Sequence, residues 1–340
     1  MKNIYLKVTD KCNLRCKHCY QTDLSNPLLA DIDVTINFIK SVMDTTDNIN
    51  VILHGGEPLL APIDYLNNLV NRLRDINIKL ITCQSNLTMD LNDQLEDFIM
   101  NKLDSIGTSY DHGSVRFTTS KILDKWKYNI NYLNNKYGYK MPLIVTFSSE
   151  LVNSEPIEIL SLFKGLEVSN VQFEKIVETS NTFTGDYIAP EYGSVDKWYS
   201  EFIRLYLIEY NKDNNIFKIN NPLGDLIYNK SLGYCYNCNS DMITLQLNGD
   251  ICECPSTYDV IGNIKGNYTD IIKNVKMNRL IKDRYKSINM CKDCKYLQYC
   301  KYGNCYKLPH TITDRSGNCR GYPVTTEYLL NYYKTTPEVK

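Results

Sequence analysis

The sequence lacks any long apolar run. No stretch approaches the roughly 18 apolar residues that a membrane helix needs, and the N-terminus MKNIYLKVTDK has no apolar signal core. Neither sign of charge is in excess, because 38 Lys and Arg residues balance 39 Asp and Glu residues. This balance gives no electrostatic reason to expect nucleic acid or an anionic membrane as a partner. These absences predict a cytoplasmic protein.

Cysteine is missing from the middle of the chain. The stretch 84–234 has none, although the 340 residues include 13 cysteines. Three of them occur by residue 19, Cys83 stands alone, and nine fall between 235 and 319. In a cytoplasmic protein this clustering favours metal sites over disulfides. With 43% hydrophobic residues, the chain can build a full core for one large domain or two ordinary ones.

The first cysteine group is Cys12, Cys16 and Cys19 in CNLRCKHC. Three thiolates at this spacing can hold three irons of a [4Fe–4S] cube and leave the fourth iron open. An open iron can bind a substrate or cofactor, whereas a fully ligated cluster mostly passes electrons. Zinc is the alternative, but it requires a fourth ligand close by. His18 lies between two of the cysteines, where it cannot easily complete a tetrahedron.

Short apolar runs alternate with helical patterns over about the first 180 residues. The expected strands are Ile4–Val8, Ile49–Leu53, Ile78–Cys83, Ser105–Ser109, Leu143–Phe147 and Val171–Ile176. Apolar residues at helical spacing lie between them, and Asp31 and Ser154 are expected helix caps. Six strand–helix units predict an α/β fold with a parallel sheet, either open and doubly wound or a partial barrel. Ligands should gather at the carboxyl ends of the strands.

Polar motifs follow the expected strands. The second strand is followed by Gly55, Gly56 and Glu57, and the third by Gln84-Ser85-Asn86. Two glycines let the backbone approach a ligand closely, and a glutamate can accept a hydrogen bond from an amino group. Each motif alone is common in ordinary loops. The position of the glycine pair, one strand after the cysteine group, favours a ligand site.

These residues resemble the radical S-adenosylmethionine (SAM) superfamily. CNLRCKHC is similar to its CxxxCxxC motif and GGEP to its amino-group-binding turn. Gln84–Thr88 resembles the QTNGT segment with Leu87 in place of glycine, and Thr108–Asp111 resembles the SxD segment. The resemblance covers residues 3 to 180 and implies a partial (β/α)6 TIM-like barrel. It also implies reductive cleavage of SAM to a 5′-deoxyadenosyl radical, which abstracts hydrogen from a substrate C–H bond.

The resemblance also implies roles for single residues. Glu57 and the backbone of Gly55 and Gly56 would hold the SAM amino group. His18 would lie near the adenine, and Arg116 would pair with the carboxylate, although an exposed arginine is the alternative. Hydroxyl and amide groups for the ribose or the amino acid moiety would come from Gln84, Asn86 and Ser109.

The back portion resembles the SPASM extension, an auxiliary-cluster domain. One implied [4Fe–4S] cluster has the ligands Cys291, Cys294, Cys300 and Cys319. The other has Cys235, Cys238, Cys254 and Cys305, of which Cys305 comes one residue late for the motif. Zinc ribbons are the alternative. The expected organisation is a radical SAM barrel at 1–185, a helical bridge at 186–234, a SPASM domain at 235–320 and a tail at 321–340.

Two cysteines, Cys83 and Cys252, remain without a ligand role. By resemblance to peptide epimerases, either could return a hydrogen atom to a substrate radical. The alternative for each is a buried inert thiol.

The predicted function is an oxygen-sensitive radical SAM/SPASM enzyme with three [4Fe–4S] clusters that modifies a C–H bond of a ribosomally made peptide. The product would be a crosslink, thioether, epimer or oxidised residue, and flavodoxin or ferredoxin would supply electrons. No leader-binding domain is expected before Cys12. One alternative is a dehydrogenase of a small alcohol, a sugar or a protein side chain. Among these, sulfatase maturases have an acidic residue where Pro255 stands. The non-enzyme alternative is a zinc-binding interaction module.

Overall fold

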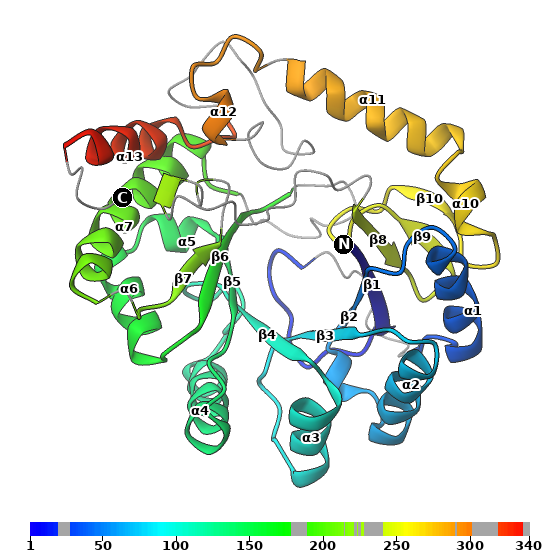
Figure 1. Ribbon diagram of the computed structural model, residues 1–340. Helices are drawn as coiled ribbons and strands as arrows, with labels where there is room; N and C mark the ends of the chain where they lie inside the picture. Colours follow the sequence, from blue (N-terminus) through cyan, green and yellow to red (C-terminus); the bar gives the residue numbers. More distant parts are fainter. Residues whose placement is uncertain are drawn as a thin grey trace. The chain divides into compact units, whose positions relative to one another are not determined.

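The computed structural model describes residues 1–19, 28–177, 189–213, 215–220, 223, 226–227, 241–289, 291–300 and 319–335 (Figure 1). The chain divides into two compact units. Unit 1 consists of Met1–Ser109, Thr179–Asp186 and Asn237–Lys282. Unit 2 consists of Tyr110–Glu178, Tyr187–Tyr236 and Asp283–Lys340.

Unit 1 is built on a sheet whose strand order is β10-β9-β8-β1-β2-β3-β4. Strands β8, β1, β2, β3 and β4 are parallel, whereas β9 and β10 are antiparallel to their neighbours. The strands are β1 (Lys2–Thr9), β2 (Ile49–Gly55), β3 (Leu80–Ser85), β4 (Ser105–Tyr110), β8 (Met242–Leu245), β9 (Asp250–Cys252) and β10 (Val260–Asn263).

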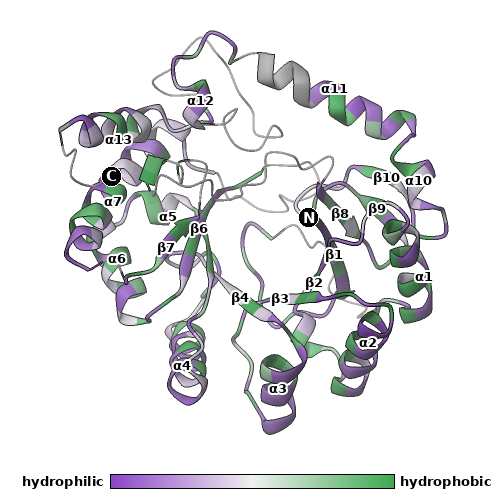
Figure 2. Cartoon of the chain, viewed as in Figure 1, coloured by the Kyte–Doolittle hydropathy of each residue, from purple (hydrophilic) through white to green (hydrophobic). Residues whose placement is uncertain are grey.

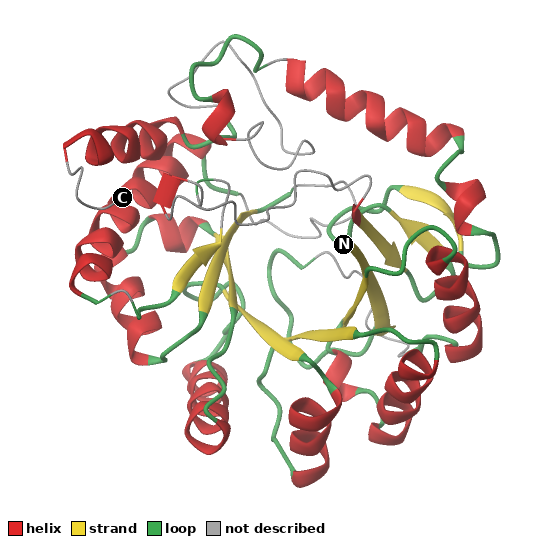
Figure 3. Ribbon diagram, in the orientation of Figure 1, coloured by secondary structure: helices red, strands yellow, loops and turns green. Residues whose placement is uncertain are grey.

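Helices pack on one side of these strands (Figure 3). They are α1 (Ile32–Met43), α2 (Ile63–Asp75), α3 (Asp93–Asp97) and α10 (Tyr268–Ile271). Unit 1 also includes the 3-10 helix η1 (Pro58–Leu60), the π-helix η2 (Phe98–Lys102) and the start of α11 (Val275–Asn289). Hydrophobic and hydrophilic residues alternate along α1 and α2 (Figure 2), which is typical of amphipathic helices. Ile4, Leu6 and Val8 of β1 are at most 1% exposed, so alternate residues of this strand form the core.

Unit 2 contains the parallel strands β5 (Leu143–Phe147), β6 (Asn170–Lys175) and β7 (Lys218–Asn220). Its helices are α4 (Ser120–Tyr137), α5 (Ser149–Val152), α6 (Pro156–Gly165), α7 (Tyr192–Lys212), α12 (Leu297–Cys300) and α13 (Pro323–Thr335). Aromatic side chains of β5, β6 and α7 fill the core. They include Phe147, Phe173, Trp198, Tyr199 and Phe202, with ring centroids 5.0 to 6.2 Å apart in the contacting pairs Phe173–Phe202 and Phe147–Trp198.

The predicted α/β class with parallel strands is confirmed, and all six expected strands are present within two residues of the expected bounds. Asp31 caps α1 as expected, because its Oδ1 accepts from the Val34 N–H at 3.0 Å. The expected cap at Ser154 is wrong. Glu155 precedes α6, and Pro156 at the first helical position defines the start. The four-part domain division stays a prediction.

Among the described helices, none is long and apolar enough to cross a membrane.

Candidate active site

The three front cysteines lie in the loop that leaves the carboxyl end of β1, and all three are half-buried. The Cys19 N–H donates to the Cys16 carbonyl at 3.1 Å, and the Leu14 N–H donates to the Cys12 Sγ at 3.4 Å. Leu14 is 5% exposed and anchors the loop in the core. His18 lies half-buried in the same loop.

The glycine pair at the carboxyl end of β2 packs directly against the start of this cysteine loop. The Gly56 N–H donates to the Thr9 carbonyl at 2.8 Å, and the Glu57 N–H donates to the Lys11 carbonyl at 2.7 Å. A Cβ atom at Gly56 would lie 2.4 Å from the Lys11 oxygen, and Gly55 has a φ of +132°. Only glycine fits this contact. The turn and the cysteine loop therefore form one rigid junction.

Glu57 is fully buried, and its carboxylate accepts three hydrogen bonds from the protein. Its Oε1 accepts from the Leu59 N–H at 3.1 Å and the Ser85 hydroxyl at 2.8 Å, and its Oε2 accepts from the Asn86 N–H at 2.6 Å. The carboxylate thus ties the turn after β2 to the end of β3. These contacts favour a positioning role, and the binding of a ligand amino group by Glu57 itself stays a prediction.

The loop after β3 reaches the cysteine loop through Asn86. Its Nδ2 donates to the Asn13 Oδ1 at 2.8 Å and lies 3.8 Å from the Cys12 Sγ. Asn13 in turn donates to the Thr88 Oγ1 at 3.0 Å. Leu87, which replaces the glycine of the motif, has a φ of +53°, so the backbone keeps the left-handed conformation that favours glycine. Asn13 was not predicted, because its contacts depend on the tertiary approach of two loops.

Gln84 and Ser109 lie at the ends of neighbouring strands and contact each other. The Gln84 Nε2 donates to the Ser109 Oγ at 2.9 Å. The predicted polar groups of β3 and β4 are therefore brought together on one face of the sheet.

Lys7 of β1 is a buried lysine, and it lies in the strand that leads into the cysteine loop. Burial lowers the pKa of Lys7 to about 8, and the neighbouring residues Cys252, Asp10 and Cys19, in that order, act in the opposite direction. His54 pairs with Lys7 in the register of β1 and β2. Burial first, and then Lys7, lower the pKa of His54 to about 3. Sequence reasoning missed Lys7, since a lysine in a strand pattern ordinarily indicates an exposed position.

Both spare cysteines are buried thiols of unit 1. Cys252 is fully buried, and the Gln246 Nε2 donates to its Sγ at 3.5 Å. Burial raises the pKa of Cys252 to about 11. Cys83 is 2% exposed, and burial together with Glu57 raises its pKa well above the ordinary value. Both groups therefore stay protonated, which suits an inert thiol and a hydrogen-atom donor alike.

Arg116 belongs to unit 2 and forms an ion pair with Asp111, five residues earlier in the chain. Its Nε donates to the Asp111 Oδ2 at 2.5 Å, and Asp111 is fully buried. Arg116 is thus held in place by the polar segment that follows β4, rather than extended into solvent.

Three of the back cysteines share one neighbourhood in unit 2. Burial raises the pKa of Cys291. Nearby Arg320 acts to lower this pKa, and Cys319 and Cys294 act to raise it. Arg320 is only 1% exposed. In unit 1, Cys254 is half-buried and follows β9. Cys300 lies in α12, but its side chain lies outside the described residues, as do Cys235, Cys238 and Cys305.

Within the described ranges, no three His, Cys, Asp or Glu side chains converge as a group that could hold a metal ion. The chemistry of the cysteine loop nevertheless fits an iron–sulfur cluster. Three thiols lie on one short loop, and a glycine turn whose Cβ positions are closed to side chains packs against it. Metal–thiolate bonds themselves draw such ligands together, because binding and local folding are coupled.

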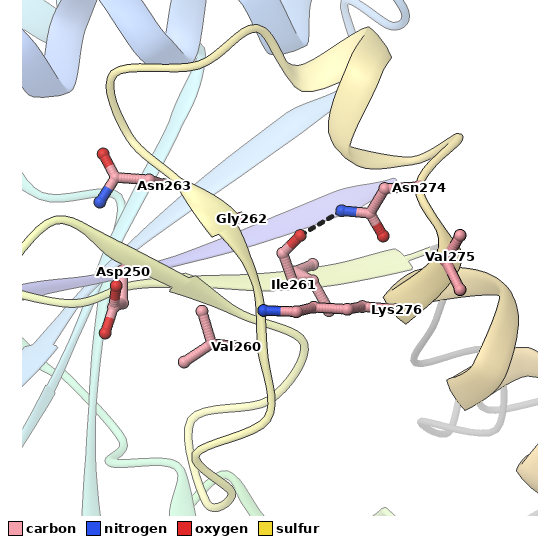
Figure 4. Close-up of a pocket in the computed structure, with 8 residues that line it drawn as sticks. All are labelled: Asp250, Val260, Ile261, Gly262, Asn263, Asn274, Val275 and Lys276. Atoms are coloured by element: carbon pink, nitrogen blue, oxygen red, sulfur yellow. Dashed lines mark hydrogen bonds between the residues drawn. The ribbon is translucent and has the colours of Figure 1, made fainter.

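A hollow of about 610 Å³ lies elsewhere in unit 1, between β9, β10 and the start of α11 (Figure 4). Asn274 donates from its side chain to the Ile261 carbonyl at its edge. The lining includes Asp250 and Lys276 but none of the predicted site residues. The candidate site is therefore the cysteine loop with its glycine turn.

A family model matches the part of the chain that includes the cysteine loop and the glycine turn. Residues 6–138 match the Radical SAM superfamily. An uncharacterized protein of Methanocaldococcus jannaschii is 31% identical over 117 residues, which are 33% of this chain and 39% of that protein. The cysteine-type anaerobic sulfatase-maturating enzyme of Clostridium perfringens is 23% identical over 95% of this chain and 90% of its own length.

A solved structure extends the likeness to the whole fold. Native anSMEcpe with bound AdoMet and Cp18Cys peptide has a TM-score of 0.77 and 19% identity, covering 99% of this chain and 97% of that one. Residues 6–138 carry the cysteine loop, the glycine turn and the ends of β3 and β4. Residues 6–138 of the chain therefore form a radical SAM domain.

Proposed function

We propose that the chain modifies a C–H bond in a peptide, using a SAM-binding [4Fe–4S] cluster held by Cys12, Cys16 and Cys19. The observation that carries the proposal is the junction of the cysteine loop with the Gly55–Gly56 turn. When bound, the cluster and SAM supply a 5′-deoxyadenosyl radical that abstracts hydrogen from the substrate. The chain's own task is to hold, orient and shield these groups.

The residues of unit 1 divide this task. The three thiols ligate iron, and the glycine turn lets backbone polar groups approach the amino group of SAM without obstruction by side chains. Glu57 and Asn86 fix the two neighbouring loops, since their hydrogen bonds connect the ends of β2 and β3 to Cys12. Gln84 and Ser109 present an amide and a hydroxyl on the same sheet face. His18 and Arg116 are the candidates for the adenine and the carboxylate.

The back cysteines hold two further [4Fe–4S] clusters in this proposal. One takes Cys291, Cys294, Cys300 and Cys319, and the other takes Cys235, Cys238, Cys254 and Cys305. The electrostatic grouping of Cys291, Cys294 and Cys319 beside buried Arg320 supports the first set. Full cysteine ligation favours electron transfer to or from the substrate, and a flavodoxin or ferredoxin would supply electrons.

A peptide substrate is supported by the relative that matches nearly end to end. The Clostridium perfringens protein is a cysteine-type sulfatase-maturating enzyme, and the anSMEcpe structure includes a bound peptide. The second candidate function is therefore oxidation of a cysteine side chain in a peptide. Pro255 argues against a sulfatase substrate, because those maturases have an acidic residue at this position. A peptide other than a sulfatase remains the leading proposal.

The first experiment tests radical formation. Anaerobically reconstituted protein is given SAM and dithionite, and 5′-deoxyadenosine is measured by liquid chromatography. We expect release from the wild type and none from the variant with Cys12, Cys16 and Cys19 all replaced by alanine. The matched control is Cys83→Ala, which removes a cysteine with no ligand role. Equal release from the triple variant would contradict the proposal.

The second experiment tests the substrate. The chain is co-expressed with small peptides encoded beside its gene and, separately, with a cysteine-containing sulfatase peptide, and each product is analysed by mass spectrometry. A mass change confined to the first set supports the leading proposal, whereas a change in the sulfatase peptide supports the second candidate. Turnover of a small alcohol with no change in any peptide would exclude both.

A further inference from the structure

The hollow beside β10 in unit 1 has no role in the site described above. Among the described strands, β10 is at the edge of the sheet order and pairs with β9 alone. The hollow, of about 610 Å³, lies between this edge strand and the start of α11, and Val260 and Val275 supply apolar contacts to it (Figure 4). Val275 is 83% exposed. Because the Asn274 side chain already donates to the Ile261 carbonyl of β10, side-chain contacts rather than an added strand would hold a partner here.

A row of basic side chains continues from the hollow along α11. The α11 row consists of four exposed cations at every third residue, Lys273, Lys276, Arg279 and Lys282. Lys276 also lines the hollow. Met277 and Leu280 are at most 8% exposed, so the side of α11 that they occupy is the packed one. None of the four cations forms an ion pair or a side-chain hydrogen bond with a described residue. Their charges are therefore available to a partner.

Nearby acidic groups do not neutralise the α11 row. Asp250, in the hollow, accepts from the Tyr258 hydroxyl at 2.9 Å and from the Asn248 Nδ2 at 2.9 Å. Asp270 and Asp283 flank the row, and the sequence has no other acidic residue between 264 and 283. The whole chain has a net charge of -1, so the positive excess is local. A local excess of exposed cations attracts an acidic partner and orients it.

We propose that the α11 row and the adjoining hollow bind an acidic segment of the peptide substrate, separate from the residue that is modified. This inference rests on the proposed function. From Lys276 to Lys282 the helix rises about 9 Å, which is the length of about three residues of an extended chain. Such a segment places carboxylates against the cations and an apolar side chain beside Val260 and Val275. A folded acidic protein fits less well, because its convex surface does not enter the hollow.

The test measures binding of two fluorescent synthetic peptides to the full chain by fluorescence anisotropy, without SAM or reductant. Glutamate and valine alternate in one peptide, and glutamine replaces every glutamate in the other. The charge-reversed variant carries Lys276→Glu and Arg279→Glu. Its matched control carries Lys121→Glu and Lys197→Glu, which make the same change of charge at exposed positions of α4 and α7. Val275→Ser tests the apolar contact.

We expect the wild type to bind the glutamate peptide more tightly than the glutamine peptide, and added salt to remove this difference. Charge reversal should weaken binding of the glutamate peptide about tenfold, whereas the control should bind as the wild type does. Val275→Ser should weaken both peptides. For a peptide that co-expression shows to be modified, charge reversal should raise KM and leave kcat unchanged.

Several results would overturn the inference: equal binding of the two peptides, no binding of the glutamate peptide to the wild type, or an unchanged affinity and KM after charge reversal. A dimer of the chain that charge reversal abolishes would assign this face to a second copy. Flavodoxin that binds here while the glutamate peptide does not would assign it to the electron donor. Failure of the proposed function looks different, because the wild type would then bind the glutamate peptide but release no 5′-deoxyadenosine.

Discussion

Glu57 shows how a single buried residue can position the loops of a site. A buried carboxylate is costly unless it accepts hydrogen bonds, and here two backbone N–H groups and one hydroxyl supply them. The same bonds define where the loops after β2 and β3 lie. The charge of Glu57 is therefore used to hold the backbone that surrounds Cys12.

The substitution Glu57→Gln should destabilise the fold. The amide nitrogen of glutamine would face at least one donor N–H, so a buried donor loses its partner at a cost of about 1–3 kcal/mol. Urea denaturation of the cluster-free protein measures this change. Glu155→Gln is the control, since Glu155 is exposed and makes no capping bond. An equal effect of the two substitutions would refute the positioning role.

His54 should make the stability of the cluster-free protein depend on acid. Its pKa is about 3 in the folded chain and 6.5 ordinarily, so the unfolded chain binds a proton first as the pH falls. The contribution of His54 is complete above pH 6.5 and is lost between pH 6.5 and about 3. Unfolding free energies measured across this window should fall less steeply in His54→Gln. Identical slopes in both proteins would show that His54 is not buried as a neutral ring.

At the scale of elements, the turn after β2 is the part that joins the two motifs. Gly56→Ala would force a Cβ to within 2.5 Å of two backbone oxygens, at Lys11 and Asp10. We expect a loss of about 1–3 kcal/mol and a sharp drop in iron bound after reconstitution, because the cysteine loop must move. Gly165→Ala is the control, since nothing lies within 4 Å of a Cβ there. Normal iron content in Gly56→Ala would contradict this reading of the turn.

In unit 2, a buried aspartate connects two helices. Asp196 of α7 accepts from the Val324 N–H at 2.7 Å, the Thr325 N–H at 3.0 Å and the Thr325 hydroxyl at 2.7 Å. It thereby caps α13, which begins four residues after Cys319. The proposed ligand Cys319 therefore lies four residues before a helix start that α7 holds in place.

Asp196→Ala should cost about 2 kcal/mol of stability, because three donors lose one acceptor. Asp31→Ala is the comparison. Asp31 is exposed and caps α1 through a single bond to the Val34 N–H, so its removal should cost less, about 0.5–1 kcal/mol. Chemical denaturation of both variants measures the difference. A smaller effect at Asp196 than at Asp31 would refute the role of the buried cap.

Across the whole molecule, the sequence predicted what depends on local pattern. The six front strands could be found because apolar residues recur along them, and alternate residues of β3, β4, β5 and β6 are buried. The strands β7, β8, β9 and β10 have three or four residues each, which is too short for a periodic signal. Lys7 and Asn13 escaped prediction for a different reason. The burial of Lys7 and the contacts of Asn13 arise only when β1 and its loop meet other segments of the chain.

The cysteine pattern makes a prediction about the molecule as a whole. If the chain holds three [4Fe–4S] clusters, reconstituted wild type should bind about twelve irons, and Cys291→Ala should lose about four of them. SAM cleavage should persist in this variant, because its front ligands are intact. Retention of all the iron would remove Cys291 from the ligand set. If metal analysis finds zinc instead of iron at the back cysteines, these cysteines have a structural role and do not transfer electrons. The proposed front cluster would then still be the reactive centre.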